Sequence, residues 1–318
     1  MTTAPRTACL LLTLVLLAGC GGTVFPRFHA AGADRPRWPS PPLPARIAWE
    51  GGWSGGYVRP HGIAVGSGGA VCIADPGAGV TWLQEPDRHP RAVGEGLLES
   101  PVGCALRTDG SLLVTDSVLA TVIAFSRRGR ELWRTPAGSL GRPTGIAILP
   151  GGGAVIADTT GHRLVFIDAR GRTVRTIGRR GEAPGEFNAP TALALGPGER
   201  IHVVDALNFR VQVLDRNGRP LRTIGRAGDG PGTFSRPRGV AVDRAGRVFV
   251  TDAVFDNVQV FDDRGRLLLA FGRQGRGPGQ FWMPAGIAAT GDGRLLVVDA
   301  YNRRVQVFRE LAPEEATR

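Results

Sequence analysis

The sequence predicts an all-β fold, a six-bladed β-propeller of four-stranded blades whose ring is closed by an N-terminal outer strand. Three observations predict it: a motif that recurs six times, small residues at fixed positions in every copy, and strand-like segments separated by glycine-rich turns. Repeats of this size cannot bury a core alone, so neighbouring copies must pack on one another.

The recurring motif places a proline before one strand and an aspartate at the end of the next. Both columns step by 41, 42, 47, 47 and 47 residues. Two independent columns with the same spacing indicate one structural unit that is repeated. The prolines are Pro60, Pro101, Pro143, Pro190, Pro237 and Pro284, and the aspartates are Asp75, Asp116, Asp158, Asp205, Asp252 and Asp299.

The first strand of each repeat carries small residues at two positions. Small side chains are expected where sheets converge on an axis and the taper leaves no room for bulk. The first column is Gly62, Gly103, Gly145, Ala192, Gly239 and Gly286, and the second is Ala64, Ala105, Ala147, Ala194, Ala241 and Ala288.

The other three strands of a repeat follow in order, as the fourth repeat illustrates. Residues 201–205 form a second strand that ends at the aspartate, and residues 211–214 form a third strand with alternating Val and Gln. A turn ends at Gly218, where glycine suits a tight hairpin, and residues 221–225 supply the fourth strand. Each repeat therefore predicts one four-stranded blade.

The closure of the ring is also predicted. The last repeat ends its third strand at Phe308 and lacks a fourth strand of its own, while residues 46–49 precede the first repeat with an outer-strand pattern. We expect the two segments to pair, which removes exposed edges. Deletion of residues 44–50 is expected to open the last blade.

The N-terminus predicts export and a lipid anchor. Residues 8–17 are apolar, a run too short to span a bilayer, and Leu17-Ala18-Gly19-Cys20 follows. This ending resembles bacterial lipoprotein signals, which implies cleavage before Cys20 and lipid on its sulfur. The absence of an aspartate after Cys20 implies, by the same resemblance, the outer membrane of a Gram-negative bacterium. The alternative is an ordinary secretory signal with a chance cysteine.

Composition then divides the chain into four parts. We expect a signal peptide at 1–19, a lipid-anchored tether rich in Gly and Pro at 20–43, the propeller at 44–310 and a short polar tail at 311–318. Whether the propeller faces the periplasm or the cell exterior is left open.

The charge of +11 comes from arginine alone among the basic residues. Export keeps the protein from nucleic acid, so no nucleic-acid partner is expected. The arginines are spread over turns and outer strands, which favours a solvated basic surface. The alternative is a patch for an acidic partner such as anionic polysaccharide or lipid head groups.

Cys72 and Cys104 are the cysteines outside the N-terminal region. Two thiols can pair outside the cytoplasm. Both, however, occupy positions on predicted inner strands that are apolar in other repeats, where a lone cysteine behaves as a small hydrophobic residue. The second interpretation is favoured, and pairing is left open.

The full motif resembles the NHL repeat: Gly-x-Gly-x-Phe-x-x-Pro-x-Gly-Val-Ala-Val, a strand ending in Asp, then Asn/His-x-Arg and Val-Gln-Val-Phe. The resemblance covers residues 44–308. It is strong in repeats three to six, whereas repeats one and two are shorter, lack the phenylalanine and are expected to differ in their loops. The residues that carry it are Phe187, Phe234, Phe281, His162, Arg163, Asn208, Arg210, Asn302 and Arg304.

The six repeat aspartates are expected to be structural, each accepting hydrogen bonds from turn amides. A ring of carboxylates that binds metal or performs acid–base chemistry is the alternative. The Asn/His-x-Arg turns are expected to be structural as well. Glycine-rich loops such as 228–232 are not followed by a helix, so they do not predict a phosphate site.

Ligands are expected at an end of the central channel, where loops enter the first strands and leave the second. The position after each proline varies, as a binding surface can, and reads His61, Val102, Thr144, Thr191, Arg238 and Ala285. The candidate ligand-binding residues are His61, Thr144, Thr191, Arg238, Ser117, Phe255, Asp256 and Tyr301. Which end of the channel binds is left open.

The resemblance also implies two enzyme groups as alternatives. Peptidylamidoglycolate lyases hold zinc with several channel histidines, and gluconolactonase-like propellers hold calcium with channel acids. Here His61 is the only histidine in the column after the proline, and that column contains no acid. No catalytic residue, metal or cofactor is therefore expected, although zinc or calcium would belong to the enzyme alternative.

The function we expect is that of a monomeric binding scaffold on the cell envelope. Its ligand would be a protein, a peptide or a polysaccharide, an anionic glycan among them, and its membrane contact would be the lipid on Cys20. A metal-dependent propeller enzyme is the alternative. The sequence does not identify the ligand, because blades specify the frame and loops specify the partner.

Overall fold

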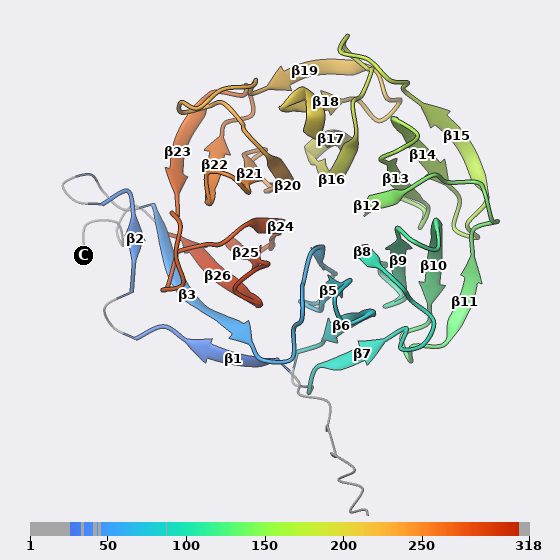
Figure 1. Ribbon diagram of the computed structural model, residues 1–318, viewed down its shortest axis with the longest axis horizontal. Helices are drawn as coiled ribbons and strands as arrows, with labels where there is room; N and C mark the ends of the chain where they lie inside the picture. Colours follow the sequence, from blue (N-terminus) through green and yellow to red (C-terminus); the bar gives the residue numbers. More distant parts are fainter. Residues whose placement is uncertain (1–25, 33–34, 41–42, 44–45, 87, 312–318) are drawn as a thin grey trace, which may run out of the picture.

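Six sheets stand around a central axis (Figure 1). The computed structural model describes residues 26–32, 35–40, 43, 46–86 and 88–311. Five sheets contain four antiparallel strands, and the sixth contains six strands. The predicted class, all-β with six blades of four strands, is confirmed.

The strands follow the repeats in chain order. The first blade is β4 (Ile63–Val65), β5 (Val71–Asp75), β6 (Val80–Gln84) and β7 (Arg91–Val93), and the second is β8 (Pro101–Leu106), β9 (Leu112–Asp116), β10 (Thr121–Phe125) and β11 (Glu131–Arg134). The third is β12 (Pro143–Ile148), β13 (Ala154–Asp158), β14 (Arg163–Ile167) and β15 (Thr173–Ile177), and the fourth is β16 (Pro190–Gly196), β17 (Arg200–Asp205), β18 (Arg210–Leu214) and β19 (Pro220–Ile224). The fifth is β20 (Pro237–Val242), β21 (Val248–Asp252), β22 (Asn257–Phe261) and β23 (Leu267–Phe271), and the sixth contains β24 (Pro284–Ala289), β25 (Arg294–Asp299) and β26 (Arg304–Glu310).

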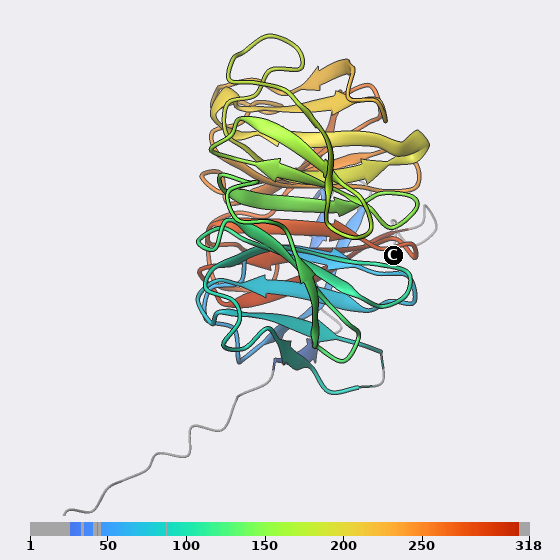
Figure 2. The ribbon, with the colours of Figure 1, turned by 90° about the vertical axis from the view of Figure 1, so that its right-hand side faces the viewer.

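Seen from the side, the ring is a disc whose strands run between its two faces (Figure 2). The helical segments of the described residues are the short 3₁₀ turns η1 (Pro197–Glu199) and η2 (Ala206–Asn208). No helix in the described part of the chain is long and apolar enough to cross a bilayer. The predicted signal peptide, Cys20 and most of the predicted polar tail lie outside the described residues.

The innermost strands approach each other too closely for larger side chains. A β-carbon built on Gly62 would lie 2.3 Å from the carbonyl oxygen of Val102 in the second blade. A β-carbon on Gly286 in the sixth blade would lie 2.5 Å from the carbonyl oxygen of His61 in the first. The small-residue column is therefore required by the close approach of neighbouring blades, and its last member lets the ring close.

Hydrophobic cores lie between neighbouring blades, and one column of loop residues contributes to each. Phe187, Phe234 and Phe281 of this column are fully buried. The phenylalanine is absent from the third repeat as well as from the two shorter ones, but in all three another apolar residue takes its position three places before the proline. The whole column is Tyr57, Leu98, Leu140, Phe187, Phe234 and Phe281, and every member is buried.

The fourth strand of the sixth blade comes from the N-terminal side of the chain. Strand β3 (Ile47–Ser54) is antiparallel to β26, with Ile47 opposite Glu310 and Ser54 opposite Arg304. A salt bridge supports this pairing, because Glu50 on β3 accepts a hydrogen bond of 2.7 Å from Arg309 on β26. The first and last parts of the propeller thus share one sheet.

Two further strands extend this sheet. Strands β1 (Arg27–Ala30) and β2 (Arg37–Trp38) both pair with β3. They lie in the segment 20–43 that composition assigns to a solvated tether, so part of that segment belongs to the propeller. The reason is aromatic packing: the Trp38 ring lies 5.8 Å from Phe271 and 5.9 Å from Phe308.

A disulfide joins Cys72 on β5 to Cys104 on β8, with Cα atoms 6.3 Å apart. The structure thus differs from the favoured interpretation of two separate buried thiols. The two apolar columns that hold these residues face each other across the interface between the first and second blades. Their spacing along the sequence does not reveal this contact.

Candidate binding face at the channel mouth

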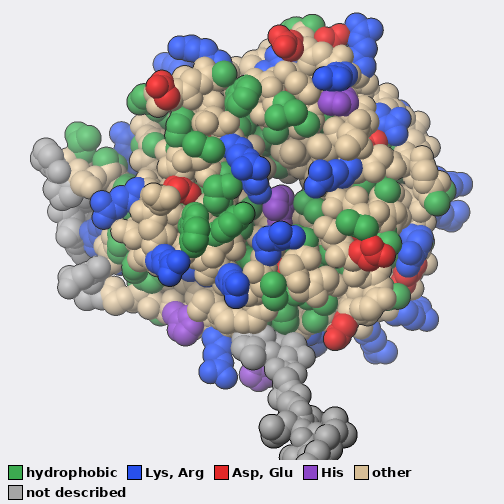
Figure 3. Space-filling model, viewed as in Figure 1, with side chains coloured by type: hydrophobic (Ala, Val, Ile, Leu, Met, Phe, Trp, Pro, Cys, Tyr) green, Lys and Arg blue, Asp and Glu red, His purple; other side chains and the backbone are tan. Residues whose placement is uncertain are grey.

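One face of the disc gathers the loops that enter the first strands and leave the second strands. Figure 3 shows this channel face, with basic and apolar side chains around a central opening. We call this opening the channel mouth, defined by His61, Thr191 and Arg238 around a small cavity of about 60 Å³. The six repeat aspartates fix the loops that surround it.

Each repeat aspartate is fully buried and holds the loop before its own proline. Asp75 accepts hydrogen bonds from the backbone amides of Val58 and Arg59 at 2.9 and 2.8 Å. Asp116 does the same for Glu99 and Ser100 at 2.8 and 2.9 Å. These are the bonds to turn amides that the sequence predicts, so the carboxylates are occupied with the positioning of the channel-face loops.

Four of the blades add side-chain donors to the aspartate, and in the first blade the donor is the Trp82 indole, 3.4 Å from Asp75. In the fourth blade Asp205 accepts from Arg210 at 2.8 Å, Asn208 at 2.9 Å and Gln212 at 3.0 Å. Asp299 has the matching set in the sixth blade, and Asp158 is paired with Arg163 in the third. The Asn/His-x-Arg motif thus supplies structural partners for the buried charge.

His61 and Arg238 meet at the channel mouth. The Nδ1 atom of His61 lies 3.3 Å from the carbonyl oxygen of Val102. Burial, followed by the positive charge of Arg238 and, to a smaller extent, of Arg59 and Arg142, lowers the pKa of His61 to about 4. Burial, followed by Arg236, lowers the pKa of Arg238. No carboxylate contributes to either effect, so the mouth is a cationic site.

Sequence reasoning missed the outer members of this cationic group. Arg59, Arg142 and Arg236 stand directly before the prolines of the first, third and fifth repeats, so they alternate around the ring. All three side chains are exposed, and none takes part in an ion pair within the described residues. The position directly before the proline carries the sequence signal for this cationic group. Across the six repeats it reads Arg59, Ser100, Arg142, Ala189, Arg236 and Met283.

The other candidate residues fall into two groups. Thr191 lines the channel, and its buried hydroxyl has no hydrogen-bond partner within the described chain. Tyr301 is exposed and packs on Trp282, with ring centroids 5.4 Å apart. These two side chains are available to a ligand beside His61 and Arg238.

The remaining candidate residues form hydrogen bonds within the protein or are partly buried in it. The hydroxyl of Thr144 is bonded to that of Thr159 at 2.8 Å. Asp256 is buried and accepts a hydrogen bond of 2.7 Å from the amide of Met283 in the next blade, and burial raises its pKa. The Ser117 hydroxyl donates to Ser100, and Phe255 is half-buried in the loop that follows Asp252.

Exposed apolar side chains surround the cationic mouth. They occupy the second position after the repeat aspartates, where the loop turns toward solvent. Val118, Leu207, Val254 and Tyr301 are 62%, 57%, 53% and 53% exposed, and Trp282 nearby is 37% exposed. These side chains form an exposed apolar rim around the cationic mouth, and exposed apolar patches are a feature of interaction sites.

No three metal-binding side chains come together anywhere in the described ranges. His61 is the only imidazole in the lining of the channel mouth. His202 is buried on β17, and His162 accepts a hydrogen bond from the amide of Ala189 between blades. The arrangement at the mouth is suited to holding an anion by hydrogen bonds and charge.

Comparison with known proteins agrees with the fold. The NHL-repeat family model matches residues 281–308, the sixth repeat. No curated protein matches the chain.

Three enzymes are among the similar solved structures, each of low sequence identity to this chain. A gluconolactonase from Xanthomonas campestris has a TM-score of 0.67 and 15% identity over 90% of this chain and 98% of that chain. A streptogramin B lyase has a TM-score of 0.61 and 11% identity over 91% and 98%. A catalytically inactive virginiamycin B lyase from Staphylococcus aureus with quinupristin has a TM-score of 0.59 and 14% identity over 92% and 90%. At such identities the likeness shows the fold alone.

The role of the repeat aspartates can be tested with Asp205→Ala. The substitution removes the acceptor for Arg210 and for the amide of Asn188, so a buried cation loses its partner. We expect the free energy of unfolding to fall by about 3 to 5 kcal/mol, measured by urea denaturation. The control Asp229→Ala, in an exposed loop, should change it by less than about 0.5 kcal/mol. Equal losses in the two variants would contradict the structural role.

Proposed function

We propose that this six-bladed NHL-repeat propeller is a binding scaffold that holds an acidic protein, peptide or polysaccharide at its channel face. One observation carries the proposal: four arginines and a histidine surround the channel mouth, and none has a carboxylate partner within the described residues. Guanidinium groups bind carboxylate, sulfate and phosphate through paired hydrogen bonds. An acidic group on the ligand would complete this site.

Two further features support the same function. The unpartnered hydroxyl of Thr191 adds a neutral hydrogen-bonding group inside the mouth. The exposed apolar residues around the mouth favour a protein or peptide segment with apolar side chains next to its acidic group. The rigid loops held by the aspartates reduce the entropy cost of binding.

The proposal includes export and a lipid anchor in the cell envelope. The apolar run 8–17, the sequence Leu17-Ala18-Gly19-Cys20 and the disulfide between Cys72 and Cys104 support it, because disulfides persist in oxidising compartments. Metabolic labelling with radioactive palmitate tests the anchor. We expect label in the wild type and none in Cys20→Ser, and label in both would contradict lipidation at Cys20.

A metal-dependent enzyme is the competing function, in keeping with the enzymes among the similar structures. Elemental analysis of the protein purified without chelators separates the two. One zinc or calcium per chain would replace the scaffold proposal with the enzyme. A metal-free protein that binds an acidic probe at the channel face supports the scaffold.

The cationic mouth can be tested with the triple substitution of Arg59, Arg142 and Arg236 to serine. The probe is a fluorescent hexaglutamate peptide, measured by anisotropy at several salt concentrations. We expect affinity to fall on the order of 100-fold, at about 1 kcal/mol for each lost guanidinium, and the salt dependence to weaken.

The matched control changes Arg170, Arg216 and Arg264 to serine. These exposed arginines lie at hairpin tips on the opposite face, and their loss lowers the net charge by the same amount. This variant should bind almost as the wild type does. Equal losses in both triple variants would show that net charge, and not the channel mouth, attracts the probe.

A second test uses the titration of His61. Its pKa is about 4 in the free protein, so the ring is neutral at pH 7. A bound anion favours the imidazolium and raises this pKa, so binding takes up a proton and tightens as the pH falls from about 7 to about 5. We expect a sulfated dextran oligomer, whose charge is constant in this range, to show the effect. His61→Gln should lose it, and identical pH profiles for the two proteins would contradict contact with His61.

A further inference from the structure

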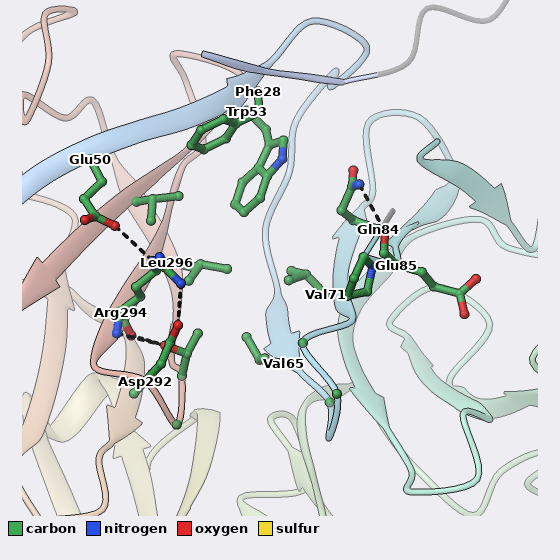
Figure 4. A pocket seen from close by; sticks show the side chains of 18 of the residues that line it. Phe28, Glu50, Trp53, Val65, Val71, Gln84, Glu85, Asp292, Arg294 and Leu296 are labelled. Carbon is green, nitrogen blue, oxygen red and sulfur yellow. Dashed lines mark hydrogen bonds and ion pairs between the residues drawn. The ribbon is translucent and has the colours of Figure 1, made fainter. Parts of the chain in front are cut away.

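A second, larger cleft opens between the first and sixth blades, with a volume of about 930 Å³. Figure 4 shows its two walls, β5 and β6 of the first blade and β25, β26 and β3 of the sixth. Hairpins 66–70 and 290–293 border it, at the ends of the first strands that are remote from the channel mouth. None of its lining residues lines the channel mouth.

The cleft lies where the closing sheet meets the first blade. Strand β3, the outer strand of the sixth blade, comes from the N-terminal side of the chain and contributes Glu50 and Trp53 to the lining. In the other blades the outer strand follows the third strand directly in the sequence, so this interface differs from the others in its construction.

Aromatic and aliphatic side chains supply the apolar part of the lining. Trp53 and Phe28 contact each other with ring centroids 5.3 Å apart, and Phe28 is half exposed. The Trp53 ring points into the space between the two blades (Figure 4). Val65, Val71, Leu296 and Val307 complete this surface.

Five of the six charged groups that line the cleft form ion pairs within the described residues. Glu50 accepts a hydrogen bond of 2.9 Å from Arg294 and lies 3.8 Å from Arg35. Arg294 also contacts Asp292. The lining contains three carboxylates, Glu50, Glu85 and Asp292, and three guanidinium groups, Arg35, Arg244 and Arg294, so its formal charge is zero. In a protein of charge +11 this balance distinguishes the cleft from the channel mouth.

We propose that this cleft binds a neutral oligosaccharide, with one sugar ring stacked on Trp53. A pyranose ring has an apolar C–H face that packs on an indole, and its hydroxyl groups both donate and accept hydrogen bonds. Carboxylate oxygens of Asp292 accept such bonds, while the Arg294 guanidinium and the Gln84 amide donate them. The formal charges of the lining cancel, which suits an uncharged ligand, and the volume lies in the range of small-ligand sites.

This site is independent of the proposed acidic ligand, so the two can succeed or fail separately. A glycan in the cleft would place a carbohydrate on one face of the disc and leave the channel face free for its own partner.

The test is saturation-transfer NMR with neutral tetrasaccharides of glucose, galactose, mannose and N-acetylglucosamine. The protein is the full chain with Cys20→Ser, which keeps it free of lipid. We expect at least one tetrasaccharide to receive saturation, and Trp53→Ala to weaken its binding about tenfold or more. Absence of a signal from all four sugars would overturn the proposal.

Two further variants test the same cleft in case Trp53→Ala does not fold. Phe28→Ala removes a half-exposed ring from the rim, and Ser67→Trp places an indole at the cleft border from an exposed hairpin position. Both should weaken sugar binding while thermal melting stays near that of the parent. Retention of full binding in both would overturn the proposal.

The matched control is Trp282→Ala, which removes an exposed tryptophan from the channel face. It should leave sugar binding unchanged, as should the triple serine variant of Arg59, Arg142 and Arg236. Loss of sugar binding in either control, with Trp53→Ala unaffected, would place the sugar at the channel mouth and overturn the cleft assignment.

Discussion

The channel face depends on one interaction, the hydrogen bonds from loop amides to a buried aspartate at the end of each second strand. The loop before the proline would otherwise leave its amides without partners near the axis of the ring, where water is scarce. The carboxylate satisfies these amides and ties the loop to its own blade. Because Arg59, Arg142 and Arg236 are members of these loops, the same bonds set the positions of the cationic group.

The distribution of charge follows from where the other carboxylates are used. Outer hairpins pair their own arginines with aspartates, as Arg172 does with Asp168 and Arg266 with Asp262. The closing sheet uses Glu50 in the same way, with three arginines around it. On the channel face the repeat aspartates pair with Arg163, Arg210 and Arg304. The arginines before the prolines have no ion pair within the described residues, so they leave positive charge at the channel mouth, whereas the formal charges of the interblade cleft lining cancel.

The sequence predicts those features that are repeated. Prolines, aspartates and small residues recur at fixed spacing, so the blades, their strands and the structural role of the aspartates can be derived from periodicity. Features that occur once are not predictable in this way. The arginines before the prolines occupy alternate repeats and are hidden by the average motif. The disulfide depends on contact between blades, and the cleft depends on the junction between the first blade and the closing sheet that carries Trp53.

Predictions also fail where a segment is read by composition alone. Residues 20–43 contain many Gly and Pro residues, and composition therefore indicates a solvated tether. Phe28 and Trp38 in this segment nevertheless pack on aromatic residues of the fifth and sixth blades. These three ring contacts accompany the pairing of β1 and β2 with β3, whose backbone groups accept further strands.

The order in which the chain joins the ring determines how the molecule responds to mechanical load. A pull from the N-terminal side reaches β1 first, then β2 and β3, all of which belong to the closing sheet. The first and second blades are held together covalently by the disulfide, whereas β3 is held to β26 by hydrogen bonds, side-chain packing and the salt bridges of Glu50. Tension would therefore separate the short outer strands β1 and β2 before it strained the blades that form the channel.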